Sequence, residues 1–214
     1  MKYFIGIIFI AILLSTGCVT QEAYDYSAFR AADPKSILVV PVVNNTMNVD
    51  APDYFLTTTS EPVAERGFYV YPVNLVKKLM ELDGLSDANL VHNADPTRLA
   101  SLFGADAVLY ITIDRWDAQY LLVSTTVTVE FSYILKDGNT GIELWSSAEM
   151  MQYTPDNNNQ SLLVMVVQAA VTKAAPNYMP LARQANKNAV LRIGRGLPAG
   201  PYNVEQYQND LDSF

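Results

Sequence analysis

The chain has 214 residues, half of them hydrophobic, and its net charge is −8 at pH 7. This length supports one domain with a sizeable core, and the acidic balance excludes a typical nucleic-acid-binding protein, which needs a basic surface. Because the chain has a single cysteine, it can form no internal disulfide, and its stability must come from packing.

The amino terminus has the pattern of a secretory signal. Lys2 supplies a positive charge, and residues 3–14 are apolar apart from Gly6. A membrane-spanning helix needs about 20 apolar residues, so this shorter run fits the apolar segment of a signal peptide. Residues 15–18, with the sequence Ser-Thr-Gly-Cys, then resemble a bacterial lipobox.

The lipobox resemblance implies that residues 1–17 are removed and that a diacylglycerol is attached to the sulfur of Cys18. Ser15 departs from the pattern, because leucine is more usual at that position. Two or three acyl chains give a stable membrane anchor. Val19 is not the aspartate that retains lipoproteins in the inner membrane, so the resemblance implies the outer membrane. An ordinary cleaved signal or a single-pass anchor, with an incidental cysteine, remains the alternative.

The remaining chain divides into three parts by composition. Residues 18–35 are polar and aromatic and are predicted to be a tether with at most one helical turn. Residues 36–195 contain the periodic apolar patterns of a folded domain. Residues 196–214 are rich in proline, glycine and acidic side chains, and are predicted to be a mobile tail.

The first half of the domain predicts a central strand followed by helices. Residues 37–43 form a nearly continuous β-branched run, as in a strand buried on both faces, with Pro41 near its end. Asp50 and Pro52 predict a helix start, and that helix should reach Gly67 with a kink at Pro62. Residues 68–73 predict a short strand. The expected apolar positions of two further helices, which end at Gly84 and Gly104, are Leu75, Leu79 and Leu82, and then Leu99, Leu102 and Phe103.

The second half predicts an antiparallel hairpin and two helices. Residues 107–113 read as a second buried strand, and 123–135 alternate strictly, which predicts a strand with one solvated face. Residues 137–141 predict the turn into a returning strand over 142–148. Residues 162–171 predict a helix on the sheet, and a last amphipathic helix has an apolar stripe of Leu181, Ala182, Ala185, Ala189, Val190 and Ile193. The fold class is therefore α/β or α+β, with a mixed sheet covered by helices in one domain.

Three stretches resemble a known family. They are residues 37–46, residues 49–72, and residues 103–112 with the sequence Phe-Gly-Ala-Asp-Ala-Val-Leu-Tyr-Ile-Thr. The sequence resembles the bacterial lipoproteins of domain-of-unknown-function family 799, typified by a genome-derived neisserial antigen, over about residues 36–191. A looser resemblance, which includes the turn at 137–145, extends to the curli-secretion lipoprotein, the lipoprotein activators of penicillin-binding proteins and the TolB amino-terminal domain. These resemblances imply a partner-binding or assembly role.

The candidate binding residues lie in the loop that follows the first strand. In open α/β sheets ligands bind at the carboxyl ends of strands. Turn and capping chemistry explains many of the same residue types without any ligand. The candidate binding loop comprises Asn44, Asn45, Thr46, Asp50 and Asp53.

No catalytic, metal or cofactor site is predicted. His92, the only histidine, is expected in a loop and lacks partners for a triad or a zinc site. Asp114 and Asp117, around Trp116, could act as a carboxylate pair, but on a regular strand they would point to opposite faces. A partner-binding surface could instead use the polar strand face at Ser124, Thr126, Thr128 and Glu130, or the aromatic side chains of Tyr110, Trp116, Tyr120 and Tyr133.

Three functions follow as hypotheses. The first is a lipid-anchored periplasmic module of the outer membrane that binds or assembles envelope proteins, attached to the membrane through Cys18. The second is a hydrolase of an envelope polymer that uses Asp114 or Glu130. The third is a surface-exposed adhesin or antigen. The sequence does not specify an oligomeric state.

Overall fold

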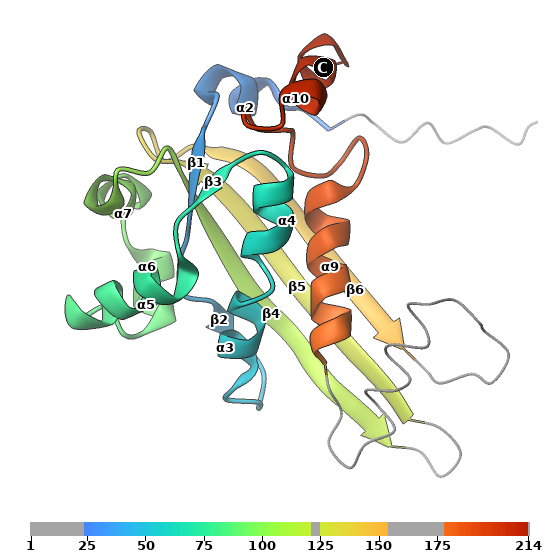
Figure 1. Cartoon of the computed structure of the whole chain (residues 1–214). Coiled ribbons are helices and arrows are strands. Elements are labelled where there is room, and N and C mark those ends of the chain that lie inside the picture. Colours follow the sequence, from blue (N-terminus) through green and yellow to red (C-terminus); the bar gives the residue numbers. More distant parts are fainter. Residues whose placement is uncertain (1–23, 121–124, 154–177, 214) are drawn as a thin grey trace, which may run out of the picture.

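The structure is a computed structural model that describes residues 24–120, 125–153 and 178–213 (Figure 1). Several predicted features lie outside the described residues. They are the predicted signal peptide, Cys18, residues Val123 and Ser124 at the start of the predicted alternating strand, and the helix predicted over 162–171.

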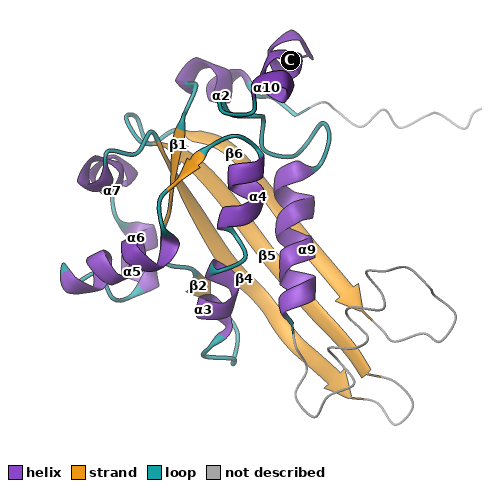
Figure 2. Cartoon of the chain, in the orientation of Figure 1, coloured by secondary structure: helices purple, strands orange, loops and turns teal. Residues whose placement is uncertain are grey.

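One mixed sheet forms the centre of the domain (Figure 2). The strand order is β3-β1-β4-β5-β6, and β2 also pairs with β4. Strands β1, β2 and β3 run parallel to their neighbours, whereas β4, β5 and β6 form a long antiparallel ribbon. The strands are β1 Ser36–Val39, β2 Val43–Asn44, β3 Tyr69–Val70, β4 Ala107–Tyr120, β5 Thr125–Asp137 and β6 Glu143–Tyr153. This arrangement confirms the predicted mixed sheet and single domain.

Helices cover both faces of the sheet and bury two apolar cores. The larger core packs against α2, Ser27–Ala32; α3, Ala51–Leu56; α4, Ser60–Glu65; and α9, Met179–Leu191. The smaller core packs against α5, Val73–Leu82; α6, Ala88–Asn93; and α7, Pro96–Phe103. The last helix, α10, Val204–Ser213, lies beside α2 at one end of the molecule (Figure 1).

The predicted inner face of β5 is confirmed. Its five apolar side chains are at most 1% exposed, because α9 and α3 pack across them; they are Val127, Val129, Phe131, Tyr133 and Leu135. The opposite face is less solvated than predicted, since Thr128 is also buried.

The predicted central strand over 37–43 is two strands, β1 and β2. Val40 N still donates to Leu109 O of β4 at 3.2 Å, and pairing resumes at Val43. Pro41 separates the strands because it has no N–H to donate to β4.

The single helix predicted from Asp50 to Gly67 is also two helices, α3 and α4. The Asp50 side chain makes no capping hydrogen bond. The break falls at Thr57–Thr59, where the Thr58 hydroxyl donates to Phe55 O at 2.7 Å. A continuous helix would need an N–H at Pro62 for the carbonyl of Thr58, so Pro62 lies instead in the first turn of α4.

The apolar stripe predicted for α5 is wrong. Leu75, Leu79 and Leu82 are 54%, 41% and 71% exposed. The helix packs on the sheet through Val73, Val76 and Met80 instead. Helix α5 is therefore apolar on two faces, only one of which the described residues cover. In α7, Leu99 is buried as predicted, whereas Leu102 is 61% exposed.

The family-like stretch 103–112 organises one end of the sheet. Asp106 Oδ2 accepts hydrogen bonds from Lys35 N at 3.0 Å and from Ser36 N at 2.9 Å, which fixes the start of β1 beside β4. Gly138 N donates to Asp106 O at 2.7 Å. A Cβ on Gly138 would lie 2.7 Å from Ala105 O, so this approach of the β5–β6 turn requires glycine.

The predicted tether and tail both extend less far than expected. Tyr26 and Phe29 are buried in the larger core, and α2 contains Phe29, so residues 24–35 belong to the folded domain. At the other end, Leu197 and Ala199 are buried and α10 follows them. Burial of these apolar side chains, which composition alone did not reveal, corrects both boundaries.

A chain of buried hydrogen bonds links α3, α9 and β5. Tyr133 Oη donates to Asn186 Oδ1 at 3.0 Å, and Asn186 Nδ2 donates to Thr58 Oγ1 at 2.7 Å. Asn186 is fully buried. Because buried polar groups are costly without partners, this network fixes the position of α9 on the sheet.

Replacing Tyr133 with phenylalanine should therefore lower the free energy of unfolding by about 1–3 kcal/mol, since Asn186 Oδ1 would lose its partner in the core. Urea unfolding followed by circular dichroism measures this loss. The matched control is Tyr71→Phe, because the Tyr71 hydroxyl bonds Gly104 O at the surface, and it should cost clearly less. Equal losses for the two variants would contradict the role given to the network.

Candidate functional site

A cavity of about 290 Å³ lies at the carboxyl ends of β1 and β2. Its wall is partly apolar, from residues near the strand ends and α3, and partly polar, from α3, α5 and the start of α6. The lining residues are Pro41, Val42, Asn44, Val49, Pro52, Asp53, Leu56, Lys77, Ser86, Ala88 and Asn89. The cavity therefore occupies the place in the sheet where the sequence predicted a binding loop.

Two of the five candidate loop residues line this cavity, Asn44 and Asp53. The Asn44 side chain mostly organises the loop: its Oδ1 accepts from Thr46 N at 3.0 Å, and its Nδ2 donates to Asn48 O at 2.8 Å. Asn45 instead bonds Asp114 across the sheet, at 3.3 Å between Nδ2 and Oδ1. Thr46, Asn45 and Asp50 are not among the lining residues, so turn chemistry accounts for much of the predicted motif.

The charged group in the cavity is an ion pair between α3 and α5. Lys77 Nζ lies 2.5 Å from Asp53 Oδ1 and 3.8 Å from Glu81 Oε1. The sequence prediction missed Lys77, Ser86 and Asn89. These residues lie 24 to 36 positions after Asp53 in the chain, so no local pattern links them to the predicted loop. The arrangement offers a paired charge, amides and a hydroxyl beside an apolar wall, which suits binding of a small polar group.

His92 has a structural role. It lies in α6 and not in the predicted loop, and its Nε2 is 3.0 Å from Pro41 O. The ring also packs edge-on against Tyr110, with 5.1 Å between the centroids. Burial lowers the pKa of His92 below its usual 6.5; the hydrogen bond with the Pro41 carbonyl opposes this shift, and nearby Lys136 adds to it. The neutral ring therefore forms a hydrogen bond with the carbonyl of Pro41. This residue lies between β1 and β2 and belongs to neither strand.

The carboxylates considered for hydrolysis lack the environment that such chemistry needs. A bulge between Ile113 and Arg115 restores Trp116 to the core side, so Asp114 and Asp117 lie on the same face and not on opposite faces. Asp114 is exposed, and its Oδ2 accepts from Ser132 Oγ at 2.6 Å. A general acid is expected in a cleft that raises its pKa, and an exposed, hydrogen-bonded carboxylate lacks this setting.

The aromatic residues suggested for a partner surface are in the core. Tyr110, Trp116 and Tyr133 are at most 5% exposed. Trp116 stacks on Tyr178, with 5.0 Å between the ring centroids. The side chain of Tyr120 is not among those that the structure describes. These three residues therefore stabilise the sheet and are not available to another protein.

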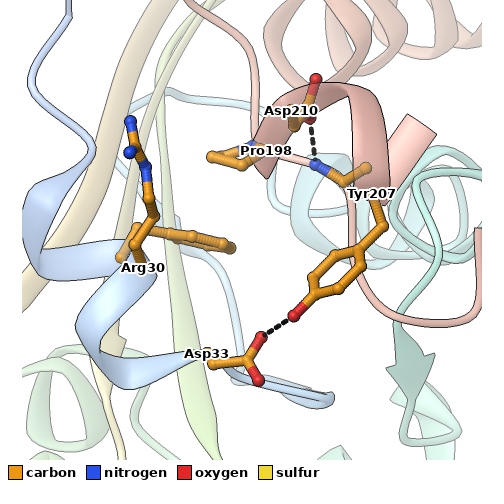
Figure 3. Close-up of a pocket in the computed structure, with 7 residues that line it drawn as sticks. Arg30, Asp33, Pro198, Tyr207 and Asp210 are labelled. Carbon is orange, nitrogen blue, oxygen red and sulfur yellow. Dashed lines mark hydrogen bonds between the residues drawn. The ribbon is translucent and has the colours of Figure 1, made fainter. Parts of the chain in front are cut away.

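A second cavity, of about 180 Å³, separates α2 from α10 (Figure 3). Tyr207 Oη donates to Asp33 Oδ1 at 2.7 Å, and Asp210 Oδ2 accepts from Ala199 N at 2.7 Å. Arg66 Nη2 also lies 3.0 Å from Asp210 Oδ2. These contacts hold α10 against α2. The cavity is therefore a gap in the packing between the two terminal helices of the domain.

One buried carboxylate was not predicted. Glu149 lies on the core side of β6, 4% exposed, and its Oε1 is 2.5 Å from Arg192 Nη2 at the end of α9. Burial raises the pKa of Glu149, and the Arg192 guanidinium opposes that rise. The predicted returning strand stopped at residue 148, which is why sequence alone did not reveal this residue.

Within the described ranges, no helix is both long and apolar enough to span a bilayer. Histidine, cysteine, aspartate and glutamate side chains in that same part of the chain form no group of three or more that could hold a metal ion.

Comparison with known proteins defines the family. Residues 24–200 match the family described as "Putative lipoprotein GNA1162-like". A relative from Neisseria meningitidis serogroup B, "Putative lipoprotein NMB1124/NMB1162", is 33% identical over 203 residues, which is 92% of this chain and 94% of that protein. The chain belongs to the GNA1162-like family. The resemblance to the genome-derived neisserial antigen seen in the sequence is thereby confirmed.

Solved structures agree with this assignment. The crystal structure of lipoprotein GNA1162 from Neisseria meningitidis is 36% identical, covers 64% of this chain and 96% of its own, and has a TM-score of 0.57. A PelC dodecamer from Paraburkholderia phytofirmans is 16% identical over 75% of this chain and 95% of its own, with a TM-score of 0.44, and is too distant to inform function. The GNA1162-like family provides the lipoprotein description but no assigned reaction.

Replacing His92 with glutamine should change how stability depends on pH. A histidine whose pKa is lowered by folding stabilises the native state above its unfolded value of about 6.5, and this contribution is lost as the pH falls through the lowered value. Wild-type protein should therefore lose stability relative to His92→Gln as the pH falls below about 6.5. Urea unfolding of both proteins at each pH measures the difference, and a constant difference would contradict the lowered pKa.

Proposed function

We propose that this protein is a lipoprotein of the outer membrane, anchored through acylated Cys18, and that its domain binds other envelope proteins on the periplasmic face. The observation that carries the proposal is the lipobox-like sequence ending at Cys18 in a chain that belongs to a family described as lipoproteins. No cofactor or metal is part of the proposal. The protein is acidic, and its negative charge opposes binding to anionic headgroups. The acyl chains on Cys18 must therefore provide the attachment to the membrane.

Helix α5 offers a surface for an envelope protein. Its Leu75, Leu79 and Leu82 recur at helical spacing on a face that the described residues leave exposed. A helix that is apolar on both sides is usually covered on both sides, whereas a helix at a solvent boundary has a polar outer face. Clusters of large exposed apolar side chains are typical of interaction sites. The α5 leucine face therefore supports binding of another protein over catalysis.

The hydrolase alternative has less support. It requires a carboxylic acid whose proton is held in a cleft, and Asp114 lies exposed with both oxygens accepting hydrogen bonds. The adhesin alternative shares the lipid anchor and differs only in orientation. Protease added to intact cells distinguishes the two orientations, since only a surface-exposed domain would be cut.

Replacing Cys18 with alanine should abolish lipid attachment, because no other thiol exists in the chain. We expect wild-type protein to enter the detergent phase in phase separation and to carry the mass of a diacylglycerol, and Cys18→Ala to lose that mass. His92→Gln, a change inside the folded domain, is the control and should partition like wild type. A Cys18→Ala protein of unchanged mass and partition would refute the anchor.

A photo-crosslinking amino acid at position 79 should capture an envelope protein in living cells. The matched control is position 74 on the same helix, because Asn74 is exposed and is not three or four positions from any of the three leucines. We expect several-fold more crosslinked product from position 79. Equal yields, or monomer alone at both positions, would remove the α5 leucine face from the proposal.

A further inference from the structure

The chain enters the folded domain beside the turn that follows α9. Tyr24 is the first described residue, and its Oη accepts from Ser146 N at 2.9 Å. Tyr24, Arg192 and Arg195 line one cavity of about 460 Å³. Figure 1 shows α2, which follows Tyr24 in the chain, at the end of the molecule where α9 leads into α10. The entry point of the tether and residues 192–195, here named the post-α9 turn, therefore lie together.

The post-α9 turn presents an isoleucine to the outside. The sequence predicted Ile193 in the apolar stripe of the last helix, but α9 ends at Leu191 and Ile193 is 98% exposed. The turn is held in place on both sides. Gly196 N donates to Arg192 O at 2.7 Å, and Trp145 Nε1 donates to Arg195 O at 3.1 Å.

The side chains of the turn match the interface of a bilayer. Ile193 stands between Arg192 and Arg195, both exposed. Arg192 contacts Glu149 through Nη2 yet remains 46% exposed, so its guanidinium can also meet a phosphate. An apolar side chain that enters the acyl boundary between arginines at the headgroups is the pattern of interfacial membrane contacts.

The length of the tether keeps this turn near the membrane. From Cys18 to Tyr24 there are six residue steps (24 − 18 = 6), which span about 22 Å when fully extended. An acylated Cys18 lies at the bilayer surface. The end of the domain that holds Tyr24 therefore cannot move farther than this from the headgroups.

We propose that the post-α9 turn is a second membrane contact, with Ile193 at the acyl boundary and Arg192 and Arg195 at lipid phosphates. This proposal rests on the lipid anchor proposed above. The contact depends on that anchor. Helix α10 brings Glu205 and Asp210 to the same end of the molecule, and their negative charges oppose binding of an unanchored domain to anionic lipid. It orients the domain, since it turns the end with α2 and α10 toward the bilayer.

The test places a single fluorophore on the lipidated full-length protein. With Cys18 acylated, Ile193→Cys supplies the only free thiol, and an environment-sensitive dye is attached there. The matched control is Met47→Cys, because Met47 is 99% exposed and lies in the loop after β2, away from the post-α9 turn. Both proteins are reconstituted into vesicles of phosphatidylethanolamine and phosphatidylglycerol, with and without acyl-chain spin labels as quenchers.

We expect the dye at position 193 to emit at shorter wavelength in vesicles and to be quenched by the spin labels, while the dye at position 47 shows neither change. Identical emission at both positions, in protein that floats with the vesicles, would overturn this contact and leave the anchor intact. Failure of the protein to float would overturn the anchor and the contact together. A wavelength shift without quenching would indicate contact between protein molecules and would also overturn the proposal.

Discussion

The pairing of β4 with its neighbours is the constraint on which the rest of the molecule depends. This strand joins the parallel part of the sheet to the antiparallel ribbon, since β1, β2 and β5 all pair with it. Asp106 fixes its start to β1 through backbone hydrogen bonds. The bulge near Asp114 then shifts the alternation by one residue, so that Trp116 returns to the core. Without that shift the second half of β4 would present its polar face to the larger core.

The family-like stretches specify this scaffold and say little about partners. Asp106 and Gly138 are joined by a backbone hydrogen bond where the β5–β6 turn packs closely against the start of β4. Asp137 is buried and accepts from Thr140 N at 2.8 Å, which closes the same turn. Such residues preserve a fold whatever it binds, because fold and function are separable. The features that support the proposed functions lie on the α5 leucine face and the post-α9 turn.

These surfaces lie on different parts of the domain, which suits an anchored binding module. The post-α9 turn shares its end of the molecule with α2 and α10, whereas α5 and α6 cover the opposite face of the sheet from α9 (Figure 1). A domain that meets a bilayer at one end would leave the α5 leucine face open to other proteins. The cavity at the ends of β1 and β2 adjoins α5 through Lys77.

The sequence by itself determined the mixed sheet, the alternating β5, the helix α7 that ends at Gly104, and the family. These features depend on local periodicity and turn chemistry, which adjacent residues encode. Tertiary structure decided which apolar residues are buried. Leu75 and Ile193 fit helical stripes yet are exposed, while Tyr26 in the predicted tether and Leu197 in the predicted mobile tail are buried. It also brought Lys77 and Asn89 to Asn44. Burial and cavity lining depend on contacts between distant segments, and no local pattern contains them.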